Sequence, residues 1–284
     1  MADLYNIEKD LKVEVPSDTK QVFLVAKYDI LKHIRSKRLM AIGAILGLIL
    51  VLITFLGTYN GAYQHNVAGF VGNYTGFVNT LIIIGVTLFA GDAIVSEFQN
   101  RTGYLLFPNP VKKSSLYAGK FLASVGIMTL VIVVYYVVAI IIGLLYTGGF
   151  TELSVYSMLL AIMYGVAATG LAFLISSTMK TSTASLVLTF FMLFMILSIV
   201  TLALTVAHVK PDGELTFAGG TISDIMVQNY PQDNLNGSIG GGNRSFSLPS
   251  YHSGVAEGVA TELGWFIATT GLGYVAFKRR EMVS

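Results

Sequence analysis

Side chains that could do chemistry are scarce in this sequence, and they stand at the edges of long apolar stretches. Cysteine is absent, which excludes a thiolate nucleophile, a disulfide and a thiolate metal site. The histidines lie at or beyond the ends of the apolar stretches: His33, His65, His208 and His252. A haem held among membrane helices needs axial ligands within the bundle, and a zinc protease of the common type needs an H-E-x-x-H pair. The sequence has neither pattern and argues against both chemistries.

One charged segment interrupts the apolar sequence, and its composition is unusual for a simple connection. It reads SEFQNRTGYLLFPNPVKKSSLYAGKF and covers residues 96–121. Pro108 and Pro110 prevent a continuous helix, because proline lacks an N–H group and disfavours helical backbone in the preceding residue. We therefore expect a short helix around Glu97, a kinked turn, and a second short helix that leads into the next apolar stretch. A positively charged topology anchor would explain only the lysines, Lys112, Lys113 and Lys120.

The elements around this segment are those of a membrane protein. Of the 284 residues, 54% are hydrophobic and 12% are charged, which is about half the charged share of soluble domains. One span needs about 20 apolar residues. The stretches between charges predict an all-α fold with six transmembrane helices, at approximately 39–57, 76–95, 121–146, 154–177, 184–207 and 256–277. The Gly- and Asn-rich residues 57–76 suit a loop between the first two spans.

The basic residues define the expected orientation. Sixteen of the eighteen Lys and Arg residues fall in four segments, 1–38, 96–120, 178–183 and 278–284. Because basic residues concentrate on the cytoplasmic side, we expect both termini inside the cell and a multi-pass protein of the cell membrane. The expected organisation is a cytoplasmic tail with an amphipathic connecting helix at 1–38, followed by a six-span transmembrane domain at 39–284.

The end of the N-terminal tail has a helical pattern. Asp18 and Gln21 fit a capping box. Apolar residues then recur near helical period: Phe23, Ala26, Ile30 and Ile34. Together with the basic residues between them, they predict an interfacial helix along the inner membrane surface. A solvated helical tail with long lysine side chains is the alternative.

The charged segment resembles the cytoplasmic loop of type-2 ABC transporter permeases. Its order is Glu97, then TGYLL (102–106) with Gly103, then PNPVKK (108–113), then the pair Gly119 and Lys120. Two departures exist, since Tyr104 stands where threonine is usual and the stretch before Pro110 is slightly shorter. The rest of the chain agrees with that family in layout.

The resemblance implies that this loop docks into a separate ATPase subunit and passes ATP-driven motion to the spans. It implies a role in ATPase coupling for Glu97, Gly103, Pro108, Pro110, Lys112, Lys113 and Lys120. The implied partners are two copies of the ATPase, a second permease chain (identical or paralogous) and the lipid membrane, without nucleic acid. This chain has no G-x-x-x-x-G-K-[ST] motif. We therefore expect ATP and magnesium on the partner subunit, and no catalytic residue, cofactor or metal on this chain.

Two other functions stay open. An ion-coupled secondary transporter would need acidic residues at mid-span, and proteins of that class often show internal repeats. The acids nearest the spans lie instead at their ends: Asp92, Glu97, Glu257 and Glu262. A non-transporting membrane scaffold or assembly protein also fits the composition, and a copurifying ATPase would distinguish a permease from it.

Residues 208–255 form a long outer segment before the last expected span. Its first half is apolar enough to return to the bilayer, as the family resemblance implies, or to form an ordinary surface loop. Glu262 then lies in the outer part of the membrane. It is a candidate outer gate that helps to hold this end shut by bonding a backbone N–H of this segment or by facing a dimer cavity, or it simply reaches water. Outer sequons permit glycosylation at Asn73, Asn236 and Asn243.

Overall fold

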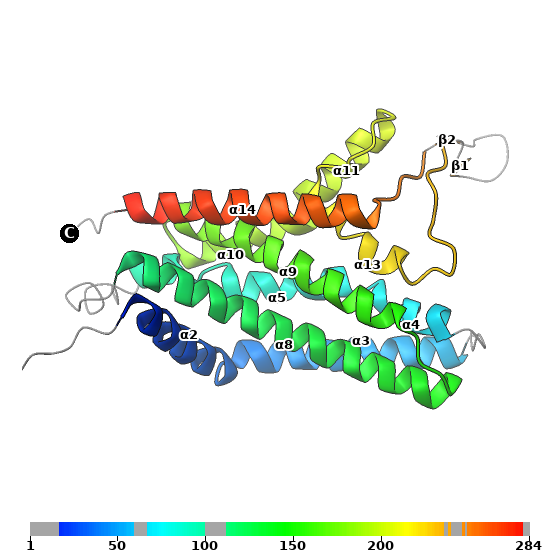
Figure 1. Cartoon of the computed structure of the whole chain (residues 1–284), viewed down its shortest axis with the longest axis horizontal. Helices are drawn as coiled ribbons and strands as arrows, with labels where there is room; N and C mark the ends of the chain where they lie inside the picture. The colour runs from blue at the N-terminus through cyan, green and yellow to red at the C-terminus, as the bar shows by residue number, and fades with distance from the viewer. Residues whose placement is uncertain are drawn as a thin grey trace, which may run out of the picture.

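The computed structural model describes residues 17–59, 67–99, 112–235, 238–239, 246–247 and 249–280. Some predicted site residues lie outside these ranges: Gly103, Pro108, Pro110, Asn236 and Asn243. The described part of the chain is a bundle of long helices that run side by side (Figure 1). The predicted all-α fold class is confirmed.

The helices follow the chain in the order of the expected spans. The first half contains α2 (Asp18–Ile34), α3 (Lys37–Tyr59), α4 (Val67–Thr75), α5 (Val78–Ala90), α6 (Val95–Gln99) and α8 (Lys113–Thr147). The second half contains α9 (Leu153–Thr178), α10 (Ser182–Phe191), a π-helical turn (Met192–Ile196), α11 (Leu197–Val206), α12 (Leu215–Ala218), α13 (Thr221–Asp224) and α14 (Val255–Arg279). Two short strands, β1 (Ser238–Ile239) and β2 (Phe246–Ser247), pair antiparallel.

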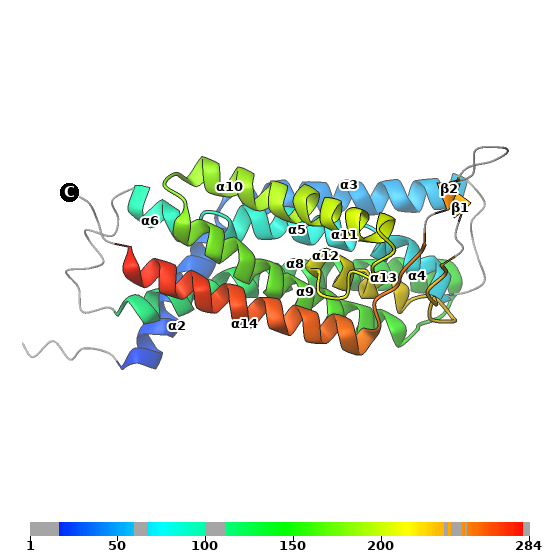
Figure 2. The same ribbon diagram turned by 90° about the horizontal axis from the view of Figure 1, so that it is seen from above.

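Five helical segments are long and apolar enough to cross a membrane: Lys37–Gly57, Val67–Gln99, Lys113–Thr147, Leu153–Thr178 and Ser182–Val206. They correspond to the first five predicted spans; each starts earlier than predicted, and the second and third start at Val67 and Lys113 instead of near 76 and 121. Helix α14 has 25 residues, but it carries charges near both ends and is not one of the five. It packs along α9 (Figures 1 and 2). The predicted count of six spans therefore stays a prediction.

The outer segment, residues 208–255, was predicted before the last span. Its first half folds back into the bundle. We name residues 214–226, which include α12 and α13, the plug. The Asn79 amide donates a hydrogen bond to the Gly219 carbonyl at 3.0 Å, and the Ser157 hydroxyl donates one to the Ile222 carbonyl at 2.6 Å. The plug is thus bonded to the core helices α5 and α9, which favours the re-entrant arrangement over an ordinary surface loop.

The two ends of the bundle differ in charge. One end, which we name the basic end, gathers helix α2, the end of α6, the start of α8 and the end of α14 (Figures 1 and 2). Helix α4, the turn between α8 and α9, and the plug lie toward the other end, the plug end. Within the described ranges, Lys210 is the one Lys or Arg residue at the plug end.

Residues 67–75 are helical, which corrects the loop predicted for 57–76. Tyr74 is buried in α4, and its hydroxyl lies 2.9 Å from that of Thr54 in α3. The Tyr74 carbonyl accepts a hydrogen bond from the Tyr135 hydroxyl at 2.8 Å. These tertiary contacts override the weak helix propensity of a Gly-rich sequence.

The predicted capping box at the start of α2 does not form. Ser17 is the N-cap residue, and no side chain caps this helix. Gln21 instead accepts a hydrogen bond from the backbone N–H of Lys112 at 3.2 Å, and Lys112 Nζ donates to Asp18 Oδ2 at 2.6 Å. The polar residues of the first turn of α2 therefore secure the start of α8.

Helix α2 packs on α8 with one face and exposes the other. The buried residues are Gln21, Ala26, Asp29 and His33. The exposed apolar residues are Phe23, Leu24, Leu31 and Ile34. With lysines beside it, this exposed apolar face suits the predicted interfacial helix. Ala26, expected on that face, belongs to the buried one.

Two glycines allow helices to approach closely. A Cβ atom on Gly119 would lie 2.7 Å from Val25 and 2.8 Å from the carbonyl oxygen of Val22, so α8 meets the backbone of α2 there. A Cβ atom on Gly273 of α14 would lie 3.1 Å from the backbone of Leu174 in α9. Small residues at such crossings are typical of membrane helix packing.

We expect Gly119→Ala to destabilise the protein, because the new methyl group would overpack the crossing of α2 and α8. Overpacking costs about 1–3 kcal/mol. Gly47→Ala in α3 is the matched control, since nothing lies within 4 Å of the position that its new methyl group would take and alanine favours a helix. Thermal unfolding of the purified protein in detergent measures both. Equal transition temperatures for the two variants would contradict the close approach at Gly119.

Candidate functional site

A buried ammonium group joins three elements at the basic end. Lys120 Nζ in α8 lies 2.8 Å from Glu97 Oε1 in α6 and 3.3 Å from Asp29 Oδ1 in α2. The Lys120 side chain is only 4% exposed. Such a cation is tolerated away from water because two carboxylates compensate it.

Three further side chains adjoin this pair of contacts. His33 Nε2 lies 3.8 Å from Asp29 Oδ2, and burial lowers the pKa of His33 although Asp29 acts in the opposite direction. Arg38 binds Asp92 through two hydrogen bonds, at 2.8 and 2.7 Å. We name these residues, Asp29, His33, Arg38, Asp92, Glu97 and Lys120, the ion-pair cluster. All of them except Glu97 border a cavity of about 220 Å³.

Four members of the cluster are missing from the residues predicted to be functional: Asp29, His33, Arg38 and Asp92. A signal for two of them exists in the sequence. Arg38 and Asp92 bracket the charge-free stretch that forms the first two spans. A chain that crosses the membrane and returns brings these two positions to the same end. The signal for Asp29 is weaker, a single acid in a helix rich in lysine.

The predicted coupling loop has two described flanks. The first flank, which ends at Gln99, is fixed to the bundle. The Ser176 hydroxyl of α9 accepts hydrogen bonds from the backbone N–H groups of Ile94 and Val95, at 3.0 and 3.1 Å. Gln99 Oε1 accepts one from the backbone N–H of Ser182 at 2.6 Å. Helix α6 therefore moves with α9 and the start of α10.

The other flank, which begins at Lys112, is fixed by α2 and α14. Gln21 and Asp18 hold Lys112, as described above. Lys113 Nζ donates hydrogen bonds to the carbonyl groups of Lys278 and Arg280, at 3.4 and 3.3 Å. The Arg280 guanidinium in turn lies 4.2 Å from the centre of the Phe98 ring. Both flanks are thus connected through the end of α14.

The described coupling residues fall into two groups. Glu97 and Lys120 face each other inside the ion-pair cluster, with 14% and 4% of their side chains exposed. Lys112 and Lys113 lie on the rim of the basic end, and the Lys112 side chain is 63% exposed. Lys120 could contact another protein directly only if the buried pair opened. The coupling role of all these residues stays a prediction.

Glu262, the candidate gate residue, is buried at the plug end. It is 1% exposed, so it does not reach water. Neither carboxylate oxygen has a hydrogen-bond partner among the described residues, so the predicted bond to a backbone N–H does not form. The buried hydroxyl of Tyr164 lies beside that of Thr216 and within electrostatic reach of Glu262. Burial of an unpaired polar group such as this carboxylate is costly.

The acid that holds the plug is Glu214, which is absent from the predicted site. Its carboxylate accepts hydrogen bonds from the backbone N–H groups of Thr216 and Phe217, at 2.8 and 2.6 Å, and caps α12. The Trp265 indole N–H donates to the Gly213 carbonyl at 3.0 Å. Glutamate is not among the residues that commonly cap helices, so its type gave no signal for this role in the sequence.

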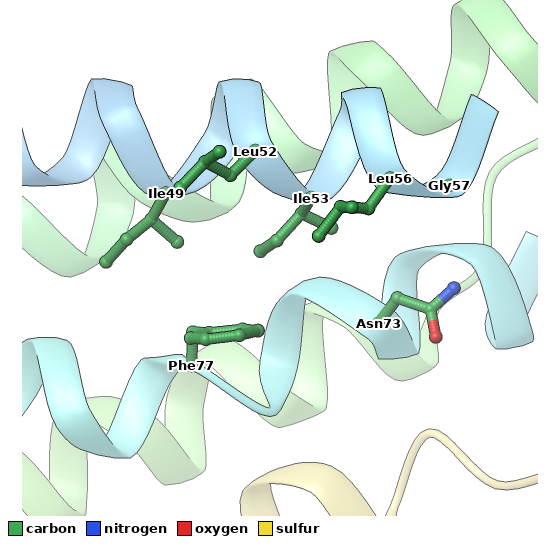
Figure 3. A pocket seen from close by; sticks show the side chains of 7 residues that line it. All are labelled: Ile49, Leu52, Ile53, Leu56, Gly57, Asn73 and Phe77. Carbon is green, nitrogen blue, oxygen red and sulfur yellow. The ribbon is translucent and has the colours of Figure 1, made fainter. Parts of the chain in front are cut away.

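Asn73 belongs to helix α4 and borders an apolar groove between α3 and the α4–α5 break. Figure 3 shows Ile49 and Ile53 on α3 opposite Phe77, with Asn73 farther along the same wall. The groove measures about 380 Å³. Asn73 is exposed, but Thr75 of its sequon is buried. This helical setting is unfavourable for the predicted glycosylation, which normally occurs on surface loops.

Comparison with known families agrees with the arrangement of apolar helices and the charged segment between them. The family model described as ABC-2 family transporter protein matches residues 23–282. The chain belongs to this family. No curated protein shows significant similarity to it.

Membership in the ABC-2 family makes this permease a multi-pass membrane protein. Proteins of the family are the transmembrane part of a transporter and are not themselves catalytic. They generally work with an ATPase subunit and form dimers. The match includes α2 from Phe23 onward, the ion-pair cluster, the plug and α14.

We expect Lys120→Met to destabilise this ABC-2 permease strongly, because Asp29 and Glu97 would lose their shared cation. Removing one partner of a buried ion pair costs about 3–5 kcal/mol. Lys32→Met is the matched control, since Lys32 Nζ lies 4.0 Å from the same carboxylate but is 63% exposed, and exposed pairs contribute about 0–1 kcal/mol. Thermal unfolding would contradict a central role for Lys120 if both variants shifted the transition by similar small amounts.

Proposed function

We propose that this chain is the membrane-spanning subunit of an ATP-driven exporter, and that residues 96–120 couple it to a separate ATPase. ATP and magnesium belong to that partner. The observation that supports the proposal is the fixing of both flanks of the loop to transmembrane helices. The export direction is carried over from the family resemblance.

The anchored flanks give a physical route for coupling. A flexible connection would absorb a displacement of the loop. Here α6 is bonded to α9 and α10, while the start of α8 is bonded to α2 and α14. Helix α8 continues for 35 residues toward the plug end. At about 1.5 Å per residue it is about 52 Å long, which exceeds a bilayer core of about 30 Å. A push at the rim would therefore reach both ends of the bundle.

The basic end is the cytoplasmic end in this proposal, and α14 is the sixth span. All described Lys and Arg residues except Lys210 lie at that end, as the positive-inside rule requires. Helix α14 begins beside the plug and ends at Arg279 on the basic rim. With six crossings, both termini lie inside the cell.

The assembly contains two permease chains, identical or paralogous, and two ATPase copies. Only 17% of the most apolar part of α3 and of the α10–α11 segment is buried within the chain, against 78% for the segment Val67–Gln99. These two weakly covered helices therefore face lipid or a second permease chain. They are the surfaces on which we place the dimer contact.

We expect a cysteine at position 112 to form a crosslink with the ATPase subunit through a bifunctional thiol reagent. The chain has no native cysteine, so each introduced thiol is unique. Lys210→Cys, at the opposite end, is the matched control and should give no such product. The complex is isolated from membranes that contain both subunits, and the products are identified by mass spectrometry. Crosslinks to the ATPase from position 210 alone would invert the proposed orientation.

Glu262 acts in this proposal as a gate residue that favours opening of the plug end. Its unpaired carboxylate on α14 is buried within electrostatic reach of Tyr164 on α9. Movement that admitted water would relieve the cost of burial. The residue therefore biases the closed plug toward release rather than holding it shut.

We expect Glu262→Leu to stabilise the closed state by about 1–3 kcal/mol, the cost of a buried unsatisfied polar group, and to slow transport. Glu257→Gln is the matched control, because Glu257 is 54% exposed and bound to Lys210 at 3.3 Å. The measurements are the thermal transition and substrate-stimulated ATPase activity of the reconstituted complex. A lower transition temperature in Glu262→Leu would mean that the carboxylate supports the closed plug.

A further inference from the structure

A groove of about 440 Å³ lies between α2 and the first part of α8, at the basic end. Figure 1 shows these two helices packed against each other there. The described lining is apolar apart from one basic side chain, and it consists of Phe23, Ala26, Lys27, Ile30, Leu31 and Leu122. The volume is in the range of ligand sites, about 300–1,000 Å³. We name it the α2 groove.

One wall of the α2 groove belongs to a membrane-spanning segment. Leu122 is part of Lys113–Thr147, which is long and apolar enough to cross a membrane. Leu122, Gly126 and Leu130 are all exposed, and their spacing of four residues places them on one face of α8. A Cβ atom on Gly126 would lie 3.8 Å from Ile30, so the glycine borders the groove. An apolar stripe therefore continues from the α2 groove along α8 into the depth of the bilayer.

The polar side chain of the α2 groove, Lys27, is exposed and has no acidic partner. Among the described residues, no acid forms a salt bridge with Lys27 or with Lys20, which lies two turns earlier on the same face of α2. Asp18 is already bound to the start of α8 at 2.6 Å, and Asp29 is buried on the opposite face of α2. The groove therefore has a positive charge at its mouth that no described residue compensates.

An apolar groove with a cationic mouth is complementary to the two parts of an anionic phospholipid. The acyl chain loses contact with water on an apolar lining, and basic residues at the membrane surface attract anionic headgroups. A zwitterionic phospholipid would use the same lining but would gain less from Lys27, because its own ammonium group compensates its phosphate. The charge of the groove therefore favours the anionic lipid.

A second copy of the chain is less complementary to the α2 groove than a lipid. A two-fold interface places the same surface patch of both copies against each other. It would bring Lys20 and Lys27 of one copy toward the same lysines of the other, and like charges repel. A lipid brings the opposite charge to the same patch.

We propose that the α2 groove is a selective binding site for one anionic phospholipid of the leaflet at the basic end. Phe23, Ile30 and Leu122 contact an acyl chain, and Lys27 binds the phosphate group. An interfacial helix as such needs only a membrane surface, whereas this site distinguishes one headgroup from another. Binding requires neither ATP nor the coupling loop. The proposal therefore stands or fails separately from the transport function, which the crosslink at position 112 tests.

The test places a fluorescent reporter in the α2 groove and bromine quenchers on the acyl chains of the membrane. The chain has a single tryptophan, Trp265 beside the plug, and Trp265→Phe removes it. In that background Phe23→Trp replaces one exposed aromatic residue of the lining by another. The full chain is reconstituted in vesicles of equal amounts of phosphatidylglycerol and phosphatidylcholine, with the bromines on one lipid or on the other. The two degrees of quenching give the relative affinity of the groove for the two lipids.

We expect phosphatidylglycerol to be preferred at Phe23→Trp by at least about fivefold, which corresponds to about 1 kcal/mol for one basic residue near an anionic headgroup. Lys27→Gln should bring the two affinities to within about twofold of each other, because glutamine is polar but carries no charge. Lys32→Gln is the matched control, since Lys32 is an exposed lysine of the same helix that does not line the groove. It should keep the preference for phosphatidylglycerol.

Phe150→Trp is the control reporter, because Phe150 is also exposed but lies in the turn between α8 and α9 at the plug end. It should show no preference beyond about twofold. Equal quenching by the two lipids at Phe23→Trp would overturn the proposal, as would the same preference at both reporters. Absence of quenching by either lipid at Phe23→Trp would mean that a second copy or another protein covers the groove, and would overturn it. An equal loss in Lys27→Gln and Lys32→Gln would assign the effect to the general charge of α2, with the same consequence.

Discussion

The arrangement of the basic end depends on one buried cation. Lys120 brings together acids from α2 and α6, which are far apart in the sequence but lie within 3.3 Å of the same ammonium group. Without it, two carboxylates would face each other away from water, and like charges at such distances repel strongly in a medium of low dielectric constant. The cation therefore fixes where the interfacial helix and the end of the second span lie against α8.

Other contacts at this end extend that constraint. Gly119, next to Lys120, lets the backbone of α2 approach α8, and Gln21 of α2 then reaches the backbone N–H of Lys112. Because α14 is bonded to Lys113, a single rigid rim connects α2, α8 and α14. This rim is where a soluble subunit would apply force, and its rigidity comes from burial and bonding rather than from the loop itself.

The spans could be predicted from the sequence because charge is nearly absent from the hydrocarbon region, so its gaps mark helices directly. The short helix at Glu97 and the helical restart at Lys113 followed equally well from the two prolines between them. Contacts between side chains that are far apart in the sequence could not be predicted in this way. Asp29 binds Lys120, and Gln21 bonds the backbone N–H of Lys112 at the start of α8 instead of capping its own helix, because tertiary contacts outweigh a local pattern such as the capping box. The helical state of residues 67–75 likewise depends on the buried Tyr74.

The two ends of the molecule use polar groups in opposite ways. At the basic end, the buried charge of Lys120 and the partly exposed charge of Arg38 have close partners, which suits a region that must transmit force without yielding. At the plug end, the buried carboxylate of Glu262 has no hydrogen-bond partner among the described residues, near a helix that leaves the bundle (Figure 1). Unpaired groups raise the free energy of the closed arrangement relative to any state that hydrates or binds them. A transporter needs this difference between its ends. At the plug end, which must open, the free-energy difference between the closed and open states has to be small. At the basic end, which receives the force, the structure has to resist opening.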